Sequence, residues 1–365
     1  MVSKRETISD AIEKTLATTP DAVVVPPPVV PPPPVPLGPL FPDPIPASAL
    51  QLGDPNGDWF WHGYFGRHTT TLFSSLWKAG KTTLISHLLK AFGTGGLFCG
   101  RLVKPTKVLY VSEEPESMWA RRRDKIGFGD HVHFQIRPFK MRPKMLEWVA
   151  LIQHIRDQVE KHDFGFVVFD PLTTLWPVEK ENEAGPVGEA LMPLSLLTEK
   201  AGVGLVHHFR KSDGTEATGS RGSGVLPGYV DTIIEFRRYA AADRKDTRRV
   251  LSGWGRFEET PEEMVVELTD DGYIAHGDKQ EVQRRTLLDV IRAILTTEEA
   301  GWDYDTVKIQ LTEEMGGESP TKATILAALE RGFAEGWIRQ TGEGKRGDPK
   351  RYHRVQNPAP KHGGF

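Results

Sequence analysis

A ten-residue stretch in the first third of the sequence has the pattern of a phosphate-binding loop. Residues 74–83 read Ser-Ser-Leu-Trp-Lys-Ala-Gly-Lys-Thr-Thr and lie between a predicted strand and a predicted helix. In such a loop, backbone N–H groups point at phosphate oxygens and the helix N-terminus adds its positive end. We expect Lys81 to reach the β- and γ-phosphates of ATP, and the hydroxyl group of Thr82 to bind Mg²⁺. The residues expected to contact the nucleotide are Ser75, Lys78, Ala79, Gly80, Lys81, Thr82 and Thr83.

Three carboxylates further along the chain complete the predicted chemistry. Asp170 follows the apolar run 164–169, and a carboxylate at the end of a hydrophobic strand normally holds the Mg²⁺ of a phosphate-loop site. Hydrolysis also needs a group that orients and deprotonates the attacking water. Glu113 and Glu114 follow another apolar run, 108–111, and Glu114 is our first choice for this base, with Glu113 as the second.

These residues need a common scaffold, which the apolar pattern predicts to be an α/β fold. Short apolar runs separated by helical patterns indicate a mostly parallel sheet covered on both faces. In such a sheet, ligands bind at the carboxyl ends of the strands, where the loop and the acids would meet. Later strands follow one another without helices and predict an antiparallel extension. The predicted strands span residues 69–74, 107–112, 131–136, 164–169, 203–208, 232–237, 249–252 and 264–268, and the predicted helices 81–92, 143–162 and 187–200.

The order of these motifs resembles that of the RecA-like ATPases. The GKTT tetrapeptide at 80–83 comes first, then a strand ending in Ser112-Glu113-Glu114-Pro115, a hydrophobic strand ending in Asp170, and a strand ending in His207-His208. Within this family the chain is most similar to the branch of the plasmid RepA-type hexameric helicases, over roughly residues 58–258. One position departs from the usual pattern, because Ser75 stands where such loops begin with glycine.

The resemblance implies further roles. His208 would sense the γ-phosphate, and Arg221 would serve as an arginine finger in the nucleotide site of a neighbouring subunit, with Lys211 and Arg210 as the alternatives. An arginine suits this role because its fixed, charged fork stabilises charge on phosphoryl oxygens. The resemblance also implies a homo-oligomeric ring, expected to be a hexamer, with single-stranded DNA passing a pore lined by residues 211–220.

The C-terminal part has the pattern of a separate winged-helix domain. Three helical patterns precede a hairpin, and the third is expected to have Ser319 as its N-cap and Pro320 at its first position. Six cations and two acids give residues 339–354 a local charge of +4. A basic wing can follow a phosphate backbone, so duplex DNA is the expected partner, and protein contact is the alternative. The wing residues expected to contact nucleic acid are Lys345, Arg346, Lys350 and Arg351.

Composition excludes several other classes. Twelve of the 28 prolines lie in residues 26–46, so that stretch cannot form a membrane-spanning helix. One cysteine, Cys99, cannot form an internal disulfide, and a net charge of −3 gives no global attraction to nucleic acid. We therefore expect a cytoplasmic protein without a membrane anchor. Its predicted parts are a disordered proline-rich tail (1–49), an ATPase domain (50–278), a winged-helix domain (284–356) and a short tail (357–365).

Two interpretations remain open at this point. The first is an oligomeric ATPase that acts on DNA as a helicase-like replication or maintenance motor. The second is an ATP-switched DNA-binding regulator that does not unwind DNA. A small-molecule kinase is disfavoured, because the histidine strand and the segment around Arg221 fit it poorly and no arginine-rich lid is present. The triplet Arg121–Arg123 is typical of a solvated helix face, with an intersubunit ion pair as the alternative.

Overall fold

The computed structural model describes residues 43–50, 59–76, 78–208, 224–240, 245–297, 300–315 and 319–355. The chain divides into two units, Met1–Leu52 and Gly53–Phe365. The described part of the first unit contains a 3-10 helix, η1 (Ala47–Ala49). Most of the predicted tail, at residues 1–42, and all of the predicted pore segment, at 211–220, lie outside the described residues.

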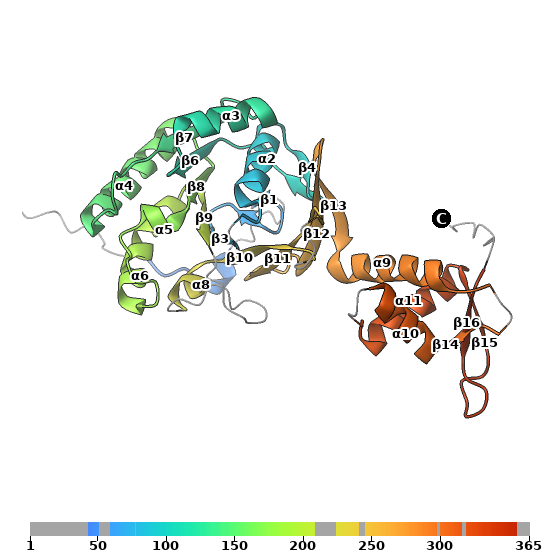
Figure 1. The fold of residues 1–365 in the computed structure, drawn as a ribbon. Helices are drawn as coiled ribbons and strands as arrows, with labels where there is room; N and C mark the ends of the chain where they lie inside the picture. Colours follow the sequence, from blue (N-terminus) through green and yellow to red (C-terminus); the bar gives the residue numbers. More distant parts are fainter. Residues whose placement is uncertain are drawn as a thin grey trace, which may run out of the picture. The chain divides into compact units, whose positions relative to one another are not determined.

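The second unit is built on a nine-stranded sheet, counted over the described residues, with the order β13-β12-β11-β10-β3-β9-β8-β6-β7 (Figure 1). The six strands from β10 to β7 are parallel, and β11, β12 and β13 continue the sheet as antiparallel neighbours. The predicted mostly parallel sheet with an antiparallel extension is therefore present. Its strands are β3 (Thr70–Ser75), β6 (Val108–Ser112), β7 (Val132–Ile136), β8 (Phe166–Asp170), β9 (Gly202–His208), β10 (Thr232–Arg238), β11 (Arg248–Gly255), β12 (Glu263–Thr269) and β13 (Gly272–Asp278).

Helices cover both faces of this sheet, so its central strands are buried on both sides. Alternate residues of a strand enter different cores, as Leu72 and Phe73 of β3 show. One core packs α2 (Lys81–Thr94) and α3 (Glu116–Ile126) on the sheet, and the other packs α4 (Met145–His162) and the short helices that follow β8. Those short helices are α5 (Leu172–Leu175), α6 (Ala184–Leu191), η2 (Met192–Leu194), α7 (Ser195–Thr198) and α8 (Val225–Tyr229). Residues 184–198 are helical without a break, so the helix predicted over 187–200 is present and includes the 3-10 turn Met192–Leu194, which contains Pro193.

A second sheet of four strands was not predicted from the sequence. Its order is β2-β1-β5-β4, and each neighbouring pair is antiparallel. Trp59, Trp61 and Tyr64, which precede β3, are buried in or beside this sheet. The strands are β1 (Trp59–Trp61), β2 (Phe65–Gly66), β4 (Gly96–Phe98) and β5 (Arg101–Val103), too short to show an alternating pattern.

The C-terminal part of the chain contains three helices and a three-stranded sheet with the order β14-β16-β15. Its core joins leucine and isoleucine side chains of all three helices to Ile338 and Tyr352 of the hairpin. The third helix has Thr321 as its N-cap, because the Thr321 hydroxyl group accepts a hydrogen bond from Thr324 N; the predicted cap at Ser319 is wrong by two residues. The elements are α9 (Lys279–Ile294), β14 (Trp302–Asp303), α10 (Tyr304–Glu314), α11 (Lys322–Ala334), β15 (Ile338–Thr341) and β16 (Arg351–Arg354).

Candidate nucleotide site

The predicted phosphate-binding loop connects β3 to α2. Strand β3 ends at Ser75 and helix α2 begins at Lys81, after Gly80 in a left-handed conformation with φ of 99°. Lys78 also has a positive φ, 58°, which is uncommon for a residue with a side chain. The loop therefore turns sharply before the helix, and the first-turn N–H groups of α2 follow directly after it.

Two hydrogen bonds to residues of β9 position the side chain of Lys81. Its Nζ donates a hydrogen bond to the backbone oxygen of His207 and another to Nδ1 of His208, both at 2.8 Å. An ammonium group has no acceptor, so Nδ1 of His208 accepts and the ring proton is assigned to Nε2. Only 5% of Lys81 is exposed, and burial lowers the pKa of its amine to about 8, against an opposing effect of Asp170. Burial and the nearby lysine lower the pKa of His208 to about 4, so the imidazole is neutral at pH 7.

Asp170 ends β8, one strand further from β3 than β9. It is 8% exposed, and its Oδ2 accepts a hydrogen bond from the hydroxyl group of Tyr110 at 2.5 Å. Burial raises the pKa of the Asp170 carboxyl to about 6, although the Tyr110 hydrogen bond and Lys81 lower it. Glu114 and Glu113 raise this pKa further by their charge. The predicted lysine and the three predicted acids therefore interact electrostatically at one edge of the sheet.

The two candidate bases differ in their partners. The Glu114 carboxylate accepts hydrogen bonds from both terminal nitrogens of Arg122, with Nη2 to Oε1 at 2.9 Å. Arg122 lies on α3 and its guanidinium group stacks 4.7 Å from the ring centroid of Trp119. Among the described residues, no hydrogen bond or ion pair involves the Glu113 carboxylate; only its backbone is bonded. The solvated face predicted for residues 121–123 is therefore wrong for Arg122, which forms an ion pair within the chain.

The antiparallel part of the main sheet also contacts the phosphate-binding loop. Nε of Arg249, on β11, donates a hydrogen bond to the backbone oxygen of Ala79 at 3.1 Å. A Cβ atom added at Gly80 would lie 3.8 Å from the ring of Phe236 on β10 and 3.9 Å from the hydroxyl group of Tyr273 on β13. The parallel strand β10 and the antiparallel strands β11 and β13 thus border the loop, and Arg249 forms the hydrogen bond to it.

The donor atoms at this edge suit Mg²⁺, which prefers oxygen ligands and usually keeps several of its waters. The second carboxylate oxygen of Asp170 has no hydrogen bond to the described residues. Thr82 lies half-buried in the first turn of α2. Among those residues no three His, Cys, Asp or Glu side chains form a metal cluster.

The other predicted site residues fall in three groups. Ser75 is buried and its hydroxyl group donates to the backbone oxygen of Leu76, while Thr83 is half-buried on α2. Arg221, Lys211 and Arg210 lie outside the described residues. On the hairpin, Lys345 pairs with Glu343, and Arg351 donates to the backbone oxygens of Ala300 and Gly301. Arg346 and Lys350 are exposed.

Three residues near the site were missed in the sequence, namely Tyr110, Arg122 and Arg249. Tyr110 could have been identified from its position in the strand. It lies two residues before Ser112, which pairs in register with Asp170, so the side chains of Tyr110 and Asp170 point to one face of the sheet. The other two contacts depend on how distant elements pack. Nothing in the sequence around Arg249 indicates a contact with a loop 170 residues earlier.

Part of the chain matches a known protein family. Residues 39–214 match the sequence profile of a family described as "AAA domain", and this segment includes the phosphate-binding loop, all three acids and both histidines of β9. A solved structure described as "Crystal structure of the RadB recombinase" is similar at 19% sequence identity with a TM-score of 0.42, covering 57% of this chain and 91% of that chain. A search of curated proteins finds no match. None of the helices in the described ranges is long and apolar enough to cross a membrane.

Proposed function

We propose that the protein is a RecA-like ATPase that hydrolyses Mg²⁺-ATP and acts on DNA as a helicase-like replication or maintenance motor. The observation that carries this proposal is the convergence of Lys81 with Asp170, Glu113 and Glu114 at the edge that the phosphate-binding loop occupies. The match of residues 39–214 to the AAA domain family supports it. The ATPase domain is proposed to span residues 50–278.

In this proposal the loop and Lys81 hold the triphosphate. Backbone N–H groups at the start of α2 point toward phosphate oxygens, and the ammonium group of Lys81 exchanges its contact with His208 for a phosphate oxygen. Thr82 and Asp170 would hold Mg²⁺, which neutralises developing charge on the phosphates when bound. Because Tyr110 occupies only one oxygen of Asp170, the other stays available for this role.

A carboxylate at the end of β6 activates the attacking water. Glu114 is the proposed base, with Glu113 as the alternative, and its ion pair with Arg122 must open before it can take a proton. His208 lies beside Lys81, where a neutral imidazole can respond to occupation of the γ-phosphate position. Arg221 is proposed as the finger supplied to a neighbouring subunit in a hexameric ring, and an arginine is suited to spread charge on a phosphoryl group.

The C-terminal helices and hairpin are proposed to form a winged-helix domain at residues 284–356 that contacts duplex DNA. The order of helices and strands supports this, since the two-stranded hairpin follows the third helix and β14 joins its sheet. The exposed cations of the hairpin loop, Arg346 and Lys350, have phosphates as natural partners. Arg351 contributes less to this surface, because its guanidinium group is already bonded within the domain.

Two acid-to-amide substitutions test the hydrolytic site. We expect Glu114→Gln to keep ATP affinity and to lower turnover by about a hundredfold or more. Glu113→Gln is the matched neighbour and is expected to change turnover much less. Fluorescent-nucleotide binding and phosphate release measure the two effects separately. Normal hydrolysis by the Glu114→Gln protein together with loss in the Glu113→Gln protein would move the base to Glu113, and normal hydrolysis by both would contradict a base on this segment.

The DNA partner separates a motor from an ATP-switched regulator. A motor is expected to hydrolyse ATP faster when single-stranded DNA is present and to displace strands, and light scattering should show a ring when ATP is bound. A regulator would respond mainly to a specific duplex and would displace no strand. A monomer with and without ATP would contradict the role of Arg221, because that role requires a neighbouring subunit.

A further inference from the structure

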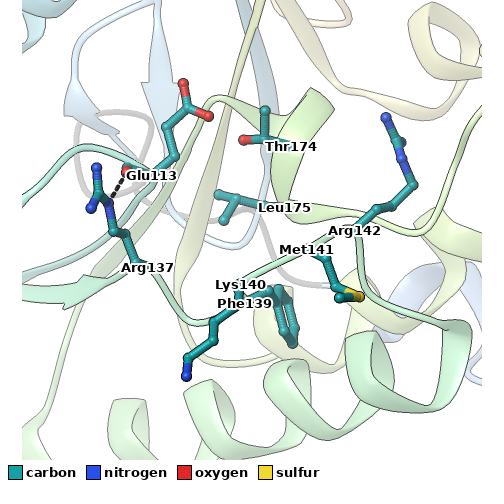
Figure 2. Close-up of a pocket in the computed structure, with 8 residues that line it drawn as sticks. All are labelled: Glu113, Arg137, Phe139, Lys140, Met141, Arg142, Thr174 and Leu175. Atoms are coloured by element: carbon teal, nitrogen blue, oxygen red, sulfur yellow. Dashed lines mark hydrogen bonds between the residues drawn. The ribbon is translucent and has the colours of Figure 1, made fainter.

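A pocket of about 670 Å³ is lined in part by Glu113, the alternative base of the site described above (Figure 2). Its volume is in the range of small-ligand pockets. One wall is the segment 137–142, which follows β7, and the opposite wall is formed by Thr174 and Leu175 of α5. The other lining residues take no part in the hydrolysis proposed above.

Two arginines of this pocket are each anchored by one side-chain hydrogen bond and have further N–H groups available for a ligand. Nε of Arg137 donates to the backbone oxygen of Glu113 at 2.8 Å, and Nη1 of Arg142 donates to the backbone oxygen of Val178. Within the described residues their other guanidinium N–H groups have no protein partner. An arginine anchored through one nitrogen loses little freedom when the others bind an anion, and its fork matches phosphate oxygens.

The space between the arginines is apolar. Figure 2 shows Arg137 and Arg142 on opposite sides of the pocket with Phe139 and Leu175 between them, while the Glu113 carboxylate points away from the Phe139 ring. Met141 is 82% exposed, an unusual position for a methionine without a partner surface. Lys140 adds a third cation, so the lining has three positive groups and one negative group.

We propose that this pocket binds a stretch of single-stranded DNA, with backbone phosphates on Arg137 and Arg142 and a base against Phe139. Alternating cationic and aromatic contacts are typical of surfaces that hold single strands, because every unpaired base offers a face for stacking. A duplex keeps its bases stacked inside the helix and could use the cations but not Phe139. The inference deepens the proposed action on DNA and rests on it, and it adds a contact separate from residues 211–220 and from the hairpin.

The bound strand would touch the segment that carries the candidate bases. Arg137 donates its backbone N–H to the oxygen of Ser112 at 2.7 Å, in addition to its side-chain bond to Glu113. It has a left-handed φ of 46°, a conformation that costs energy for a residue with a side chain and that persists where the surroundings enforce it. A phosphate on Arg137 would therefore be one hydrogen bond away from the backbone of Glu113, next to Glu114, which gives single-stranded DNA a direct path to stimulate hydrolysis.

Charge reversal and loss of the ring test the pocket by direct binding. The full-length protein without nucleotide is titrated into a fluorescein-labelled oligothymidylate, and anisotropy gives the affinity at several salt concentrations. We expect Arg142→Glu to weaken binding by about tenfold and to reduce the slope of log affinity against log salt by about one. Phe139→Ala is expected to weaken binding by about tenfold with an unchanged salt slope, because it removes stacking and no charge.

Lys161→Glu is the matched control, since it makes the same charge change on an exposed residue at the end of α4. Circular dichroism verifies that each variant is folded. The proposal is wrong if Arg142→Glu and Phe139→Ala bind the oligonucleotide as tightly as Lys161→Glu does. It is also wrong if pyrophosphate displaces the strand completely and Phe139→Ala has no effect, because the pocket would then bind phosphate alone. Since no nucleotide is present, the result does not depend on whether the protein hydrolyses ATP.

Discussion

Arg122 forms a bidentate ion pair with both carboxylate oxygens of Glu114, the proposed base. The glutamate raises the pKa of the Arg122 guanidinium group, mainly through the hydrogen bonds between them. The same contact occupies both oxygens of the carboxylate, so the ion pair has to open before Glu114 can accept a proton from water. In the nucleotide-free protein the proposed base is therefore held by an arginine of the helix that follows it, α3.

Release of this restraint should speed hydrolysis. We expect Arg122→Gln to raise the basal turnover of ATP by about fivefold, since a partly exposed ion pair is worth about 1 kcal/mol. Arg121→Gln, an exposed neighbour on the same helix, is the control and should leave turnover unchanged. Steady-state phosphate release measures both. A fall in turnover for Arg122→Gln at normal ATP affinity would mean that Arg122 positions Glu114 and does not restrain it.

Asp170 should destabilise the nucleotide-free fold at neutral pH. Its pKa of about 6 lies above the usual value of 3.8, so the folded protein binds this proton more tightly than the unfolded chain. The favourable contribution is complete below pH 3.8 and is lost as the pH rises through about 6. Asp170→Asn should therefore raise the free energy of unfolding by up to about 3 kcal/mol at pH 8 and by little at pH 4, while hydrolysis is lost.

Urea unfolding at both pH values measures this difference. Asp130→Asn is the control, because it makes the same change at an exposed residue. An Asp170→Asn protein that is less stable than the unsubstituted protein at pH 8 would contradict the unfavourable burial of this carboxylate.

ATP binding should be coupled to proton uptake near pH 8. The pKa of Lys81 is about 8 without nucleotide, and triphosphate oxygens beside the amine will raise it. At pH 8 we expect uptake of about half a proton per ATP bound, and ATP affinity should weaken as the pH rises further. His208, with a pKa of about 4, remains neutral in this range and adds nothing. Calorimetric titrations in buffers with different ionisation enthalpies give the number, and proton release instead of uptake would refute the assignment.

Gly80 should tolerate no side chain. At a φ of 99° an alanine is strained whatever space surrounds it, so Gly80→Ala should lower the free energy of unfolding by about 1–2 kcal/mol and weaken ATP binding. Gly185 on α6 offers the matched control, since an added Cβ meets no atom within 4 Å there. Gly185→Ala should be neutral or stabilising by up to about 1 kcal/mol. Equal effects of the two substitutions would show that the loop can change its turn.

The sequence predicted the parts of this molecule that depend on local pattern. The strands of the parallel core are apolar on both faces, so apolar runs such as 108–111 identified them in the sequence. The acids that follow these strands lie at one edge because the carboxyl ends of parallel strands meet there. The four-stranded sheet was missed because its strands are two or three residues long. The Arg122 and Arg249 contacts depend on the packing of elements far apart in the chain, and single-sequence pattern carries no information about that packing.

The hydrogen bond from Arg249 to Ala79 shows that the surroundings of the phosphate-binding loop extend beyond the segment that matches the family. The family match ends at residue 214, before β10, yet the phosphate-binding loop is bordered by side chains from β10, β11 and β13. A chain shortened to the matched segment would lack the neighbour that fixes Ala79 and would leave one side of β3 as an unpaired edge. A fragment that keeps all of these neighbours of the loop therefore has to continue to Asp278, where β13 ends.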